Sequence, residues 1–159
     1  MVITRVSEDL TLAALADLVA LSGGKTAVYG RGVSYKGGKI SLDPALDCPI
    51  PPCFDPIMQF LARSPLTTSV HVKHGSVGKH NDKKFLRHTE GTIVFTAQDG
   101  GLVNFYEPDA ESVSLQMPTS VGHVYGVPVR VGSVTMHEVV APNRVSIVVF
   151  SVPPVPPIQ

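Results

Sequence analysis

Three residues have the chemistry and the spacing from which an iron site can be built. His80 and Asp82 are two positions apart, so at the end of a strand their side chains point to the same side. If His137 lies beside them on a later strand, two imidazoles and one carboxylate occupy one face of an octahedral ion. This ligand set suits non-haem Fe(II) and leaves positions open for other ligands. The sequence therefore predicts a metal site at these residues, with His123 as a competing third ligand.

Arg144 and Ser146 lie further along the chain, on the same side of a predicted strand. A guanidinium can hold a carboxylate through charge-assisted hydrogen bonds. The two residues therefore predict a seat for the distal carboxylate of 2-oxoglutarate. A structural alternative pairs Arg144 with a carboxylate such as Glu138. For His80 and Asp82, the structural alternative is a pair of loop residues that bond to each other.

The composition indicates one folded domain with an apolar core. The chain has 159 residues, of which 43% are hydrophobic and 16% charged, and its formal net charge is zero. These values exclude a disordered chain and provide no bulk charge for binding a polyanion. Cys48 and Cys53 have no second pair, which disfavours a structural zinc site. The sequence shows no secretory pattern at Met1 and no apolar run long enough for a membrane, so we expect a cytoplasmic protein. We expect a monomer with reduced cysteines, and a disulfide between the two cysteines is the alternative.

The first part of the chain shows helix and hairpin signals. A helix of about four turns starts near Ser7 and is closed by Gly23-Gly24. A hairpin follows with its turn at Gly37-Gly38. A proline-rich connection over 43–52 then leads to a short helix that begins at Asp55-Pro56. We expect residues 1–66 to form this N-terminal part of a single domain.

The second part of the chain reads as strands. Roughly seven or eight short strands, separated by Gly, Pro and Asn turns, indicate a sandwich or jelly roll over residues 67–152. One predicted strand covers 121–131, another ends at His137, and a tight hairpin through Pro142-Asn143 leads to the last. Residues 153–159 form a proline-rich tail.

The order of these motifs resembles that of the Fe(II)- and 2-oxoglutarate-dependent dioxygenases: H-x-D, a β-rich stretch, His, then R-x-S. Further stretches resemble the AlkB-like demethylases, including those within the replication proteins of some plant RNA viruses. In that comparison Val72 and His74 correspond to the family's asparagine and tyrosine that help hold 2-oxoglutarate, and Phe150 replaces its second arginine. The matching stretches are Tyr29-Gly30 with Val33-Ser34-Tyr35, Pro49-Ile50-Pro51, Met117-Pro118 and Arg144-Val145-Ser146-Ile147.

The resemblance implies a mainly β fold with short N-terminal helices, a double-stranded β-helix or jelly roll. It implies Fe(II) as metal and 2-oxoglutarate as co-substrate, which is decarboxylated to succinate while a C–H bond is hydroxylated. The implied reaction is demethylation of N-alkylated RNA or single-stranded DNA, with Tyr29 and Tyr35 as a stacking surface for an unstacked base. Tyrosines that only pack the hairpin are the alternative. For the whole chain, the alternative is a non-catalytic, cupin-like binding module or a viral structural module.

Overall fold

The computed structural model describes residues 3–5, 9–36, 39–63, 68–81, 92–109, 111–127, 129–130, 133–134 and 136–151. Asp82, the Gly37-Gly38 turn and the tail at 153–159 lie outside the described residues. The helices are α1 (Asp9–Leu21), the 3-10 helix η1 (Pro52–Phe54) and α2 (Asp55–Phe60). None of the helices in these ranges is long and apolar enough to cross a membrane.

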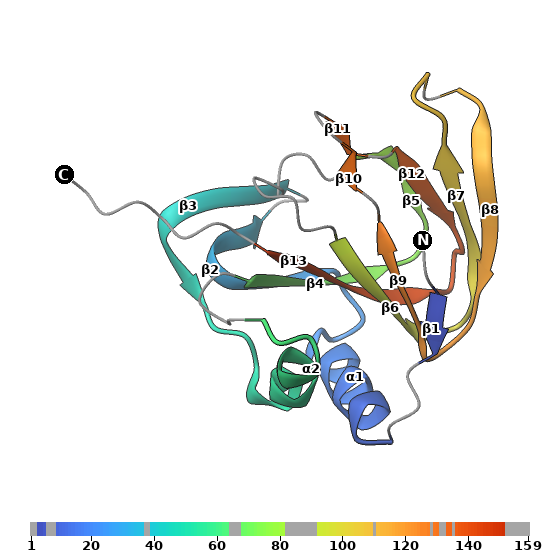
Figure 1. The fold of residues 1–159 in the computed structure, drawn as a ribbon. Coiled ribbons are helices and arrows are strands. Elements are labelled where there is room, and N and C mark those ends of the chain that lie inside the picture. The colour runs from blue at the N-terminus through green and yellow to red at the C-terminus, as the bar shows by residue number, and fades with distance from the viewer. Residues whose placement is uncertain are drawn as a thin grey trace.

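The strands form two facing antiparallel sheets and a small two-stranded one (Figure 1). The larger sheet has the order β1-β9-β6-β13-β4-β2-β3, the smaller β5-β12-β7-β8, and β10 pairs with β11. The chain passes back and forth between the two main sheets, which confirms the predicted jelly roll. The strand bounds are β1 Ile3–Arg5, β2 Ala27–Lys36, β3 Lys39–Cys48, β4 Thr68–His74, β5 Val77–His80, β6 Thr92–Gln98, β7 Gly101–Tyr106, β8 Val113–Thr119, β9 His123–Val127, β10 Val129–Arg130, β11 Ser133–Val134, β12 His137–Val140 and β13 Val145–Ser151.

The larger sheet packs against the helices on one face and against the smaller sheet on the other, so its central strand β13 carries buried apolar residues on both sides. On β13, Ile147 and Val149 pack toward α1 and α2, which cover the outer face (Figure 1). Val148 and Phe150 alternate with them and pack into the space between the sheets. Each such side chain contributes about 1.5–3 kcal/mol when fully buried. The double burial holds rigid the strand that directly follows Arg144.

Helix α1 buries one side against this sheet. Leu15 and Leu18 are almost fully buried and belong to the same cluster as Val70 and Val72 of β4. The helix ends as the sequence predicts, because Gly23 follows it with φ +64°, a left-handed conformation that favours glycine.

Two connections differ from the sequence expectation. The stretch predicted as a proline-rich connection is largely strand, since β3 continues to Cys48. Pro44 is tolerated there because β3 is an edge strand, where a missing N–H costs no ladder bond. The hairpin predicted at Pro142-Asn143 is also wrong. The turn, closed by Arg144 N–H donating to Ala141 O at 3.1 Å, carries the chain from one sheet to the other.

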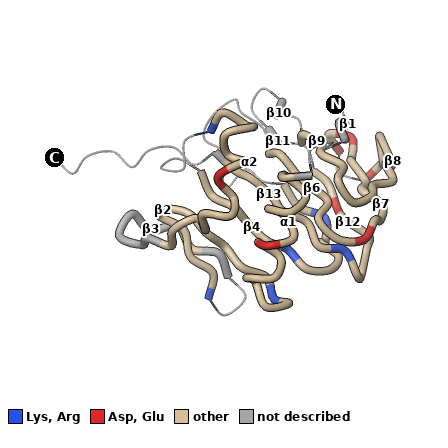
Figure 2. The backbone as a smooth tube through the Cα atoms, turned by 90° about the horizontal axis from the view of Figure 1, so that it is seen from below, with Lys and Arg blue, Asp and Glu red and all other residues tan. Residues whose placement is uncertain are grey.

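Charged residues do not gather into one basic face of the described structure. Figure 2 shows Lys and Arg positions spread over the described backbone among Asp and Glu positions. The formal net charge of the whole chain is zero. Any contact with a polyanion must therefore be local.

Gly101, at the start of β7, lies against the turn that links the two sheets. A Cβ there would collide with Ala141 Cβ and lie 3.0 Å from Val140 O. We expect Gly101→Ala to lower the free energy of unfolding by about 2 kcal/mol, because overpacking forces the neighbouring backbone to move. Urea unfolding measures this change. Gly126→Ala is the control, since its nearest atom would lie 3.9 Å away, and an equal loss there would contradict the argument.

Candidate metal and co-substrate site

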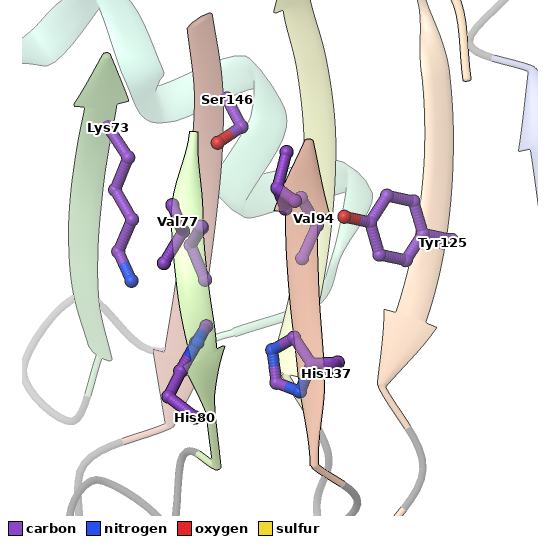
Figure 3. Close-up of a pocket in the computed structure, with 9 residues that line it drawn as sticks. Lys73, Val77, His80, Val94, Tyr125, His137 and Ser146 are labelled. Atoms are coloured by element: carbon purple, nitrogen blue, oxygen red, sulfur yellow. The ribbon is translucent and has the colours of Figure 1, made fainter. Parts of the chain in front are cut away.

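The two sheets bring His80 and His137 together. They lie opposite each other on neighbouring antiparallel strands, β5 and β12. Their ring centroids are 4.3 Å apart with an interplanar angle of 56°. Figure 3 shows both rings at one end of the pocket between the sheets. His137 is buried and His80 half-buried, so the pair is reachable from solvent on one side only.

A β-bulge directs His80 toward the inside. The register runs from His137↔His80 to Val139↔Val77, so three residue steps on β5 face two on β12. Such an extra residue re-aims side chains. Val77 and His80 both line the pocket as a result, although simple alternation would place them on opposite faces.

The hydrogen bond made by His80 determines which of its nitrogens can bind a metal ion. Its Nδ1 lies 2.6 Å from Gly78 O, and a carbonyl can only accept, so Nδ1 carries the hydrogen and donates. The lone pair of the neutral ring is then on Nε2. A backbone carbonyl that orients an imidazole in this way is a common feature of metal-binding histidines.

The third ligand predicted from the sequence, Asp82, lies outside the described residues. Within the described ranges no group of three His, Cys, Asp or Glu side chains gathers. The competing ligand His123 is on β9 in the larger sheet, where Ser120 N–H donates to its Nδ1 at 3.1 Å. The facing imidazoles of His80 and His137, together with the carboxylate that the sequence predicts at Asp82, form a ligand set that fits Fe(II).

The pocket beside the histidines is small and has no acidic lining residue among those described. The empty space there is about 310 Å³, with the open mouth included. In Figure 3 the side chain of Lys73 runs along one wall toward the level of His80. An ammonium and imidazoles without a carboxylate suit an anionic ligand. The lining residues are Lys73, Val77, His80, Val94, Tyr125, His137, Val139, Ser146 and Val148.

Arg144 is a buried cation that lacks partners for two of its nitrogens. Only 1% of the residue is exposed. Its Nη2 donates to Thr96 Oγ1 at 3.0 Å and to Tyr125 Oη at 3.4 Å. Nε and Nη1 have no hydrogen-bond partner in the described structure. A buried charged donor without a partner is costly, so these nitrogens mark a place where an anion would bind favourably.

The arginine adjoins the histidine pocket through Tyr125 and Ser146. Tyr125 lines the pocket and its hydroxyl contacts the guanidinium. Ser146, two residues after Arg144, also lines the pocket and is paired in register with Lys73 and Thr96. Lys73, Ser146 and Thr96 thus form a row of polar side chains across the inner face of the larger sheet, beside Arg144.

Glu138 is not the partner of Arg144. Its Oε1 accepts hydrogen bonds from the hydroxyl of Tyr106 and, at 2.9 Å, from Asn104 Nδ2 on the smaller sheet. The hydrogen bond from Tyr106 is the main cause that lowers the pKa of Glu138, and it raises the pKa of Tyr106. The alternative in which Arg144 forms an ion pair with Glu138 is therefore wrong.

Sequence reasoning missed Lys73, Thr96 and Tyr125. Val72 and His74 stand where the AlkB-like family has the asparagine and tyrosine that help hold 2-oxoglutarate. Val72 packs in the cluster under the helices. The His74 Nε2 lies 3.0 Å from Ser22 Oγ. A shift of one residue along a strand reverses the face, so β4 presents Lys73 to the pocket instead.

The two tyrosines predicted to stack a base do not line this pocket. Tyr29 packs against the cluster under the helices, and burial raises its pKa. Tyr35, near the end of β2, is 39% exposed. The stacking role stays a prediction. Cys48 and Cys53 are free thiols, and burial raises the pKa of Cys53.

Comparison with known proteins finds likeness in structure and not in sequence. No protein-family model and no curated protein sequence matches the chain. OsALKBH1 superposes with a TM-score of 0.58 at 14% identity, covering 94% of this chain and 97% of that one. YcfD, a ribosomal oxygenase from Escherichia coli, gives 0.53 at 11% identity, covering 98% and 48%. A Pseudomonas putida prolyl-4-hydroxylase gives 0.50 at 13% identity, covering 96% and 92%.

The chain shares its jelly-roll fold with these solved structures. It spans about half the length of YcfD, whose structure has also been solved in complex with cobalt and succinic acid. In this fold the histidine pair lies on the smaller sheet, and Arg144 lies at the start of a strand of the larger one. The identities are low, so the likeness defines the fold and the chemistry depends on this chain's own residues.

Proposed function

We propose that this chain is an Fe(II)- and 2-oxoglutarate-dependent dioxygenase. The observation that supports it most is the facing pair of imidazoles, His80 and His137, at an inter-sheet pocket that adjoins the buried Arg144 through Tyr125. Two guanidinium nitrogens of Arg144 have no hydrogen-bond partner among the described residues. The histidines suit a metal and the arginine suits a carboxylate. The oxygenase fold supports the same assignment.

Each residue has a distinct part in this proposal. His80 and His137 would hold the metal, with Asp82 as the third ligand, and Arg144 would donate to the distal carboxylate of 2-oxoglutarate beside Ser146. Fe(II), when bound, supplies the activation of dioxygen for oxidation of a C–H bond. The apolar side chains between the sheets keep water from the buried part of the pocket.

The test of this function is an anaerobic titration of the protein with Fe(II) and 2-oxoglutarate. We expect a weak visible charge-transfer band, followed by iron-dependent formation of succinate when air is admitted. No band from folded protein with iron in excess would overturn the proposal. Binding of 2-oxoglutarate without turnover would favour a cupin-like binding module instead.

The substrate class we propose is an N-methylated base in RNA or single-stranded DNA. The support is the motif resemblance to the AlkB-like demethylases and the structural likeness to OsALKBH1. Because a base must leave the stack to enter a pocket, we expect faster formaldehyde release from methylated single strands than from duplexes. Succinate formation that no methylated oligonucleotide stimulates would overturn this substrate and leave the dioxygenase standing.

A further inference from the structure

A polar network lies on the outer face of the smaller sheet, behind the histidine pair. Its centre is Glu138, whose Oε1 accepts from the Tyr106 hydroxyl and from Asn104 Nδ2. Gln116 Nε2 in turn donates to Asn104 Oδ1 at 3.0 Å. Tyr106 and Asn104 are only 7% and 8% exposed, whereas Glu138 is half-buried and Gln116 is exposed.

The network touches all four strands of that sheet. Glu138 is on β12, Tyr106 and Asn104 on β7, and Gln116 on β8. Lys79 of β5 places its ammonium 4.1 Å from the centroid of the Tyr106 ring. Lys79 and Glu138 each adjoin one of the two histidines in the sequence, but their side chains take part in the network behind the sheet.

The backbone alone holds this part of the sheet weakly. Strand β5 has four residues and lies at the edge, so it pairs with β12 only. Its pairing is interrupted by the bulge between His137 and Val139, where Glu138 is located. A bulge leaves part of the ladder unpaired. A side-chain link spans this interrupted pairing, because Lys79 of β5 contacts the Tyr106 ring and the Tyr106 hydroxyl donates to Glu138 of β12.

We propose that Glu138, held by Tyr106 and Asn104, is a positioning residue that sets the geometry of the His80–His137 pair for metal binding. This inference rests on the metal site of the proposed function. It goes beyond it by assigning a role to residues on the opposite face, which touch neither the metal position nor the pocket. Glu138 acts on the metal through the backbone of β12.

The experiment is a visible titration of the full chain with Co²⁺, whose spectrum reports its coordination geometry. We expect Glu138→Ala to raise the dissociation constant about tenfold, the lower end of the effect of removing a partner that orients a metal ligand. Tyr106→Phe should raise it less, with an altered cobalt spectrum. Glu138→Gln, which keeps an acceptor oxygen, should bind close to wild type.

The control is Ser114→Ala, which removes a hydroxyl from the same sheet. Ser114 Oγ donates to Phe105 O and makes no bond to β12, so cobalt affinity should stay at the wild-type value. All titrations are made well below the thermal midpoint of each apo-protein, so that global unfolding does not contribute. Should Glu138→Ala fail to fold, Tyr106→Phe carries the test, because it retains the ring.

The possible outcomes separate this inference from the proposed function. Wild-type affinity and spectrum in folded Glu138→Ala and Tyr106→Phe, with lower thermal stability only, would show a purely structural network and overturn the inference. A wild-type chain that does not bind cobalt would overturn the metal site, and the inference with it. Weakened binding in both variants, with rescue by Glu138→Gln, supports the positioning role.

Discussion

Replacing Arg144 with methionine is expected to weaken binding of 2-oxoglutarate strongly and to leave the stability of the unliganded protein close to that of wild type. The loss of binding follows from the two guanidinium nitrogens that have no hydrogen-bond partner among the described residues. Removing one member of a buried charge pair costs about 2–5 kcal/mol. We therefore expect the dissociation constant to rise at least about thirtyfold, which corresponds to about 2 kcal/mol.

The stability of the unliganded variant depends on the same buried guanidinium. The guanidinium of Arg144 is 99% removed from water, yet it makes hydrogen bonds only to the Thr96 and Tyr125 hydroxyls. Replacing buried ionic groups by apolar residues of similar volume is often neutral or stabilising, by about 1–4 kcal/mol. Loss of the two hydrogen bonds costs about 1 kcal/mol each, so the net change in the free energy of unfolding lies between about −1 and about +2 kcal/mol. A buried arginine with a structural role would behave in the opposite way, with a clear loss of stability on replacement.

Two measurements on the same variants check this prediction. Calorimetric titration with 2-oxoglutarate and Mn²⁺ measures the affinity, and urea unfolding without ligand measures the stability. Arg31→Met is the matched control, because Arg31 is exposed on β2 and should affect neither. Arg144→Lys should bind weakly, since an ammonium lacks the planar set of donors. A variant that is destabilised and still binds 2-oxoglutarate would contradict the argument.

The sequence was sufficient for the parts of this site that local spacing defines. Turn residues and alternating apolar strands predicted the jelly roll, and the motif order singled out His80, His137 and Arg144. Those three do lie around one pocket or adjoin it. Strand spacing was enough here because each residue stands at or next to the end of a strand, where the chain changes sheet.

Other features depend on pairing between distant strands, which one sequence does not reveal. Lys73 could be assigned to the pocket only from the register of β4 against β13. The bulge that turns both Val77 and His80 inward breaks simple alternation, and nothing in the local sequence marks it beyond Gly78. Tyr125 reaches Arg144 from a strand two places away in the sheet, which only the strand order explains.

The affinity for a divalent metal ion should depend on His80 and His137 and should not depend on His123. Loss of a residue that merely orients a ligand weakens metal binding about 10–100-fold. Loss of a ligand itself removes a coordinate bond, so His80→Ala and His137→Ala are each expected to weaken Co²⁺ or Mn²⁺ binding by more than about a hundredfold. The measurement is a cobalt titration, with the metal-induced rise in thermal midpoint as an independent readout. At one hundred times the dissociation constant, a bound ion stabilises the folded state by about 2.7 kcal/mol.

His123→Ala is the matched control, since it also removes an imidazole, but from the larger sheet. The His123 ring lies beside Ser120, whose Oγ is 3.1 Å from Nε2, and it is not among the residues that line the pocket. Its removal should leave both the affinity and the metal-induced stabilisation unchanged. If His123→Ala lost the metal while His137→Ala kept it, the facing rings on β5 and β12 would not be the metal site. Any iron chemistry would then have to be sought around β9.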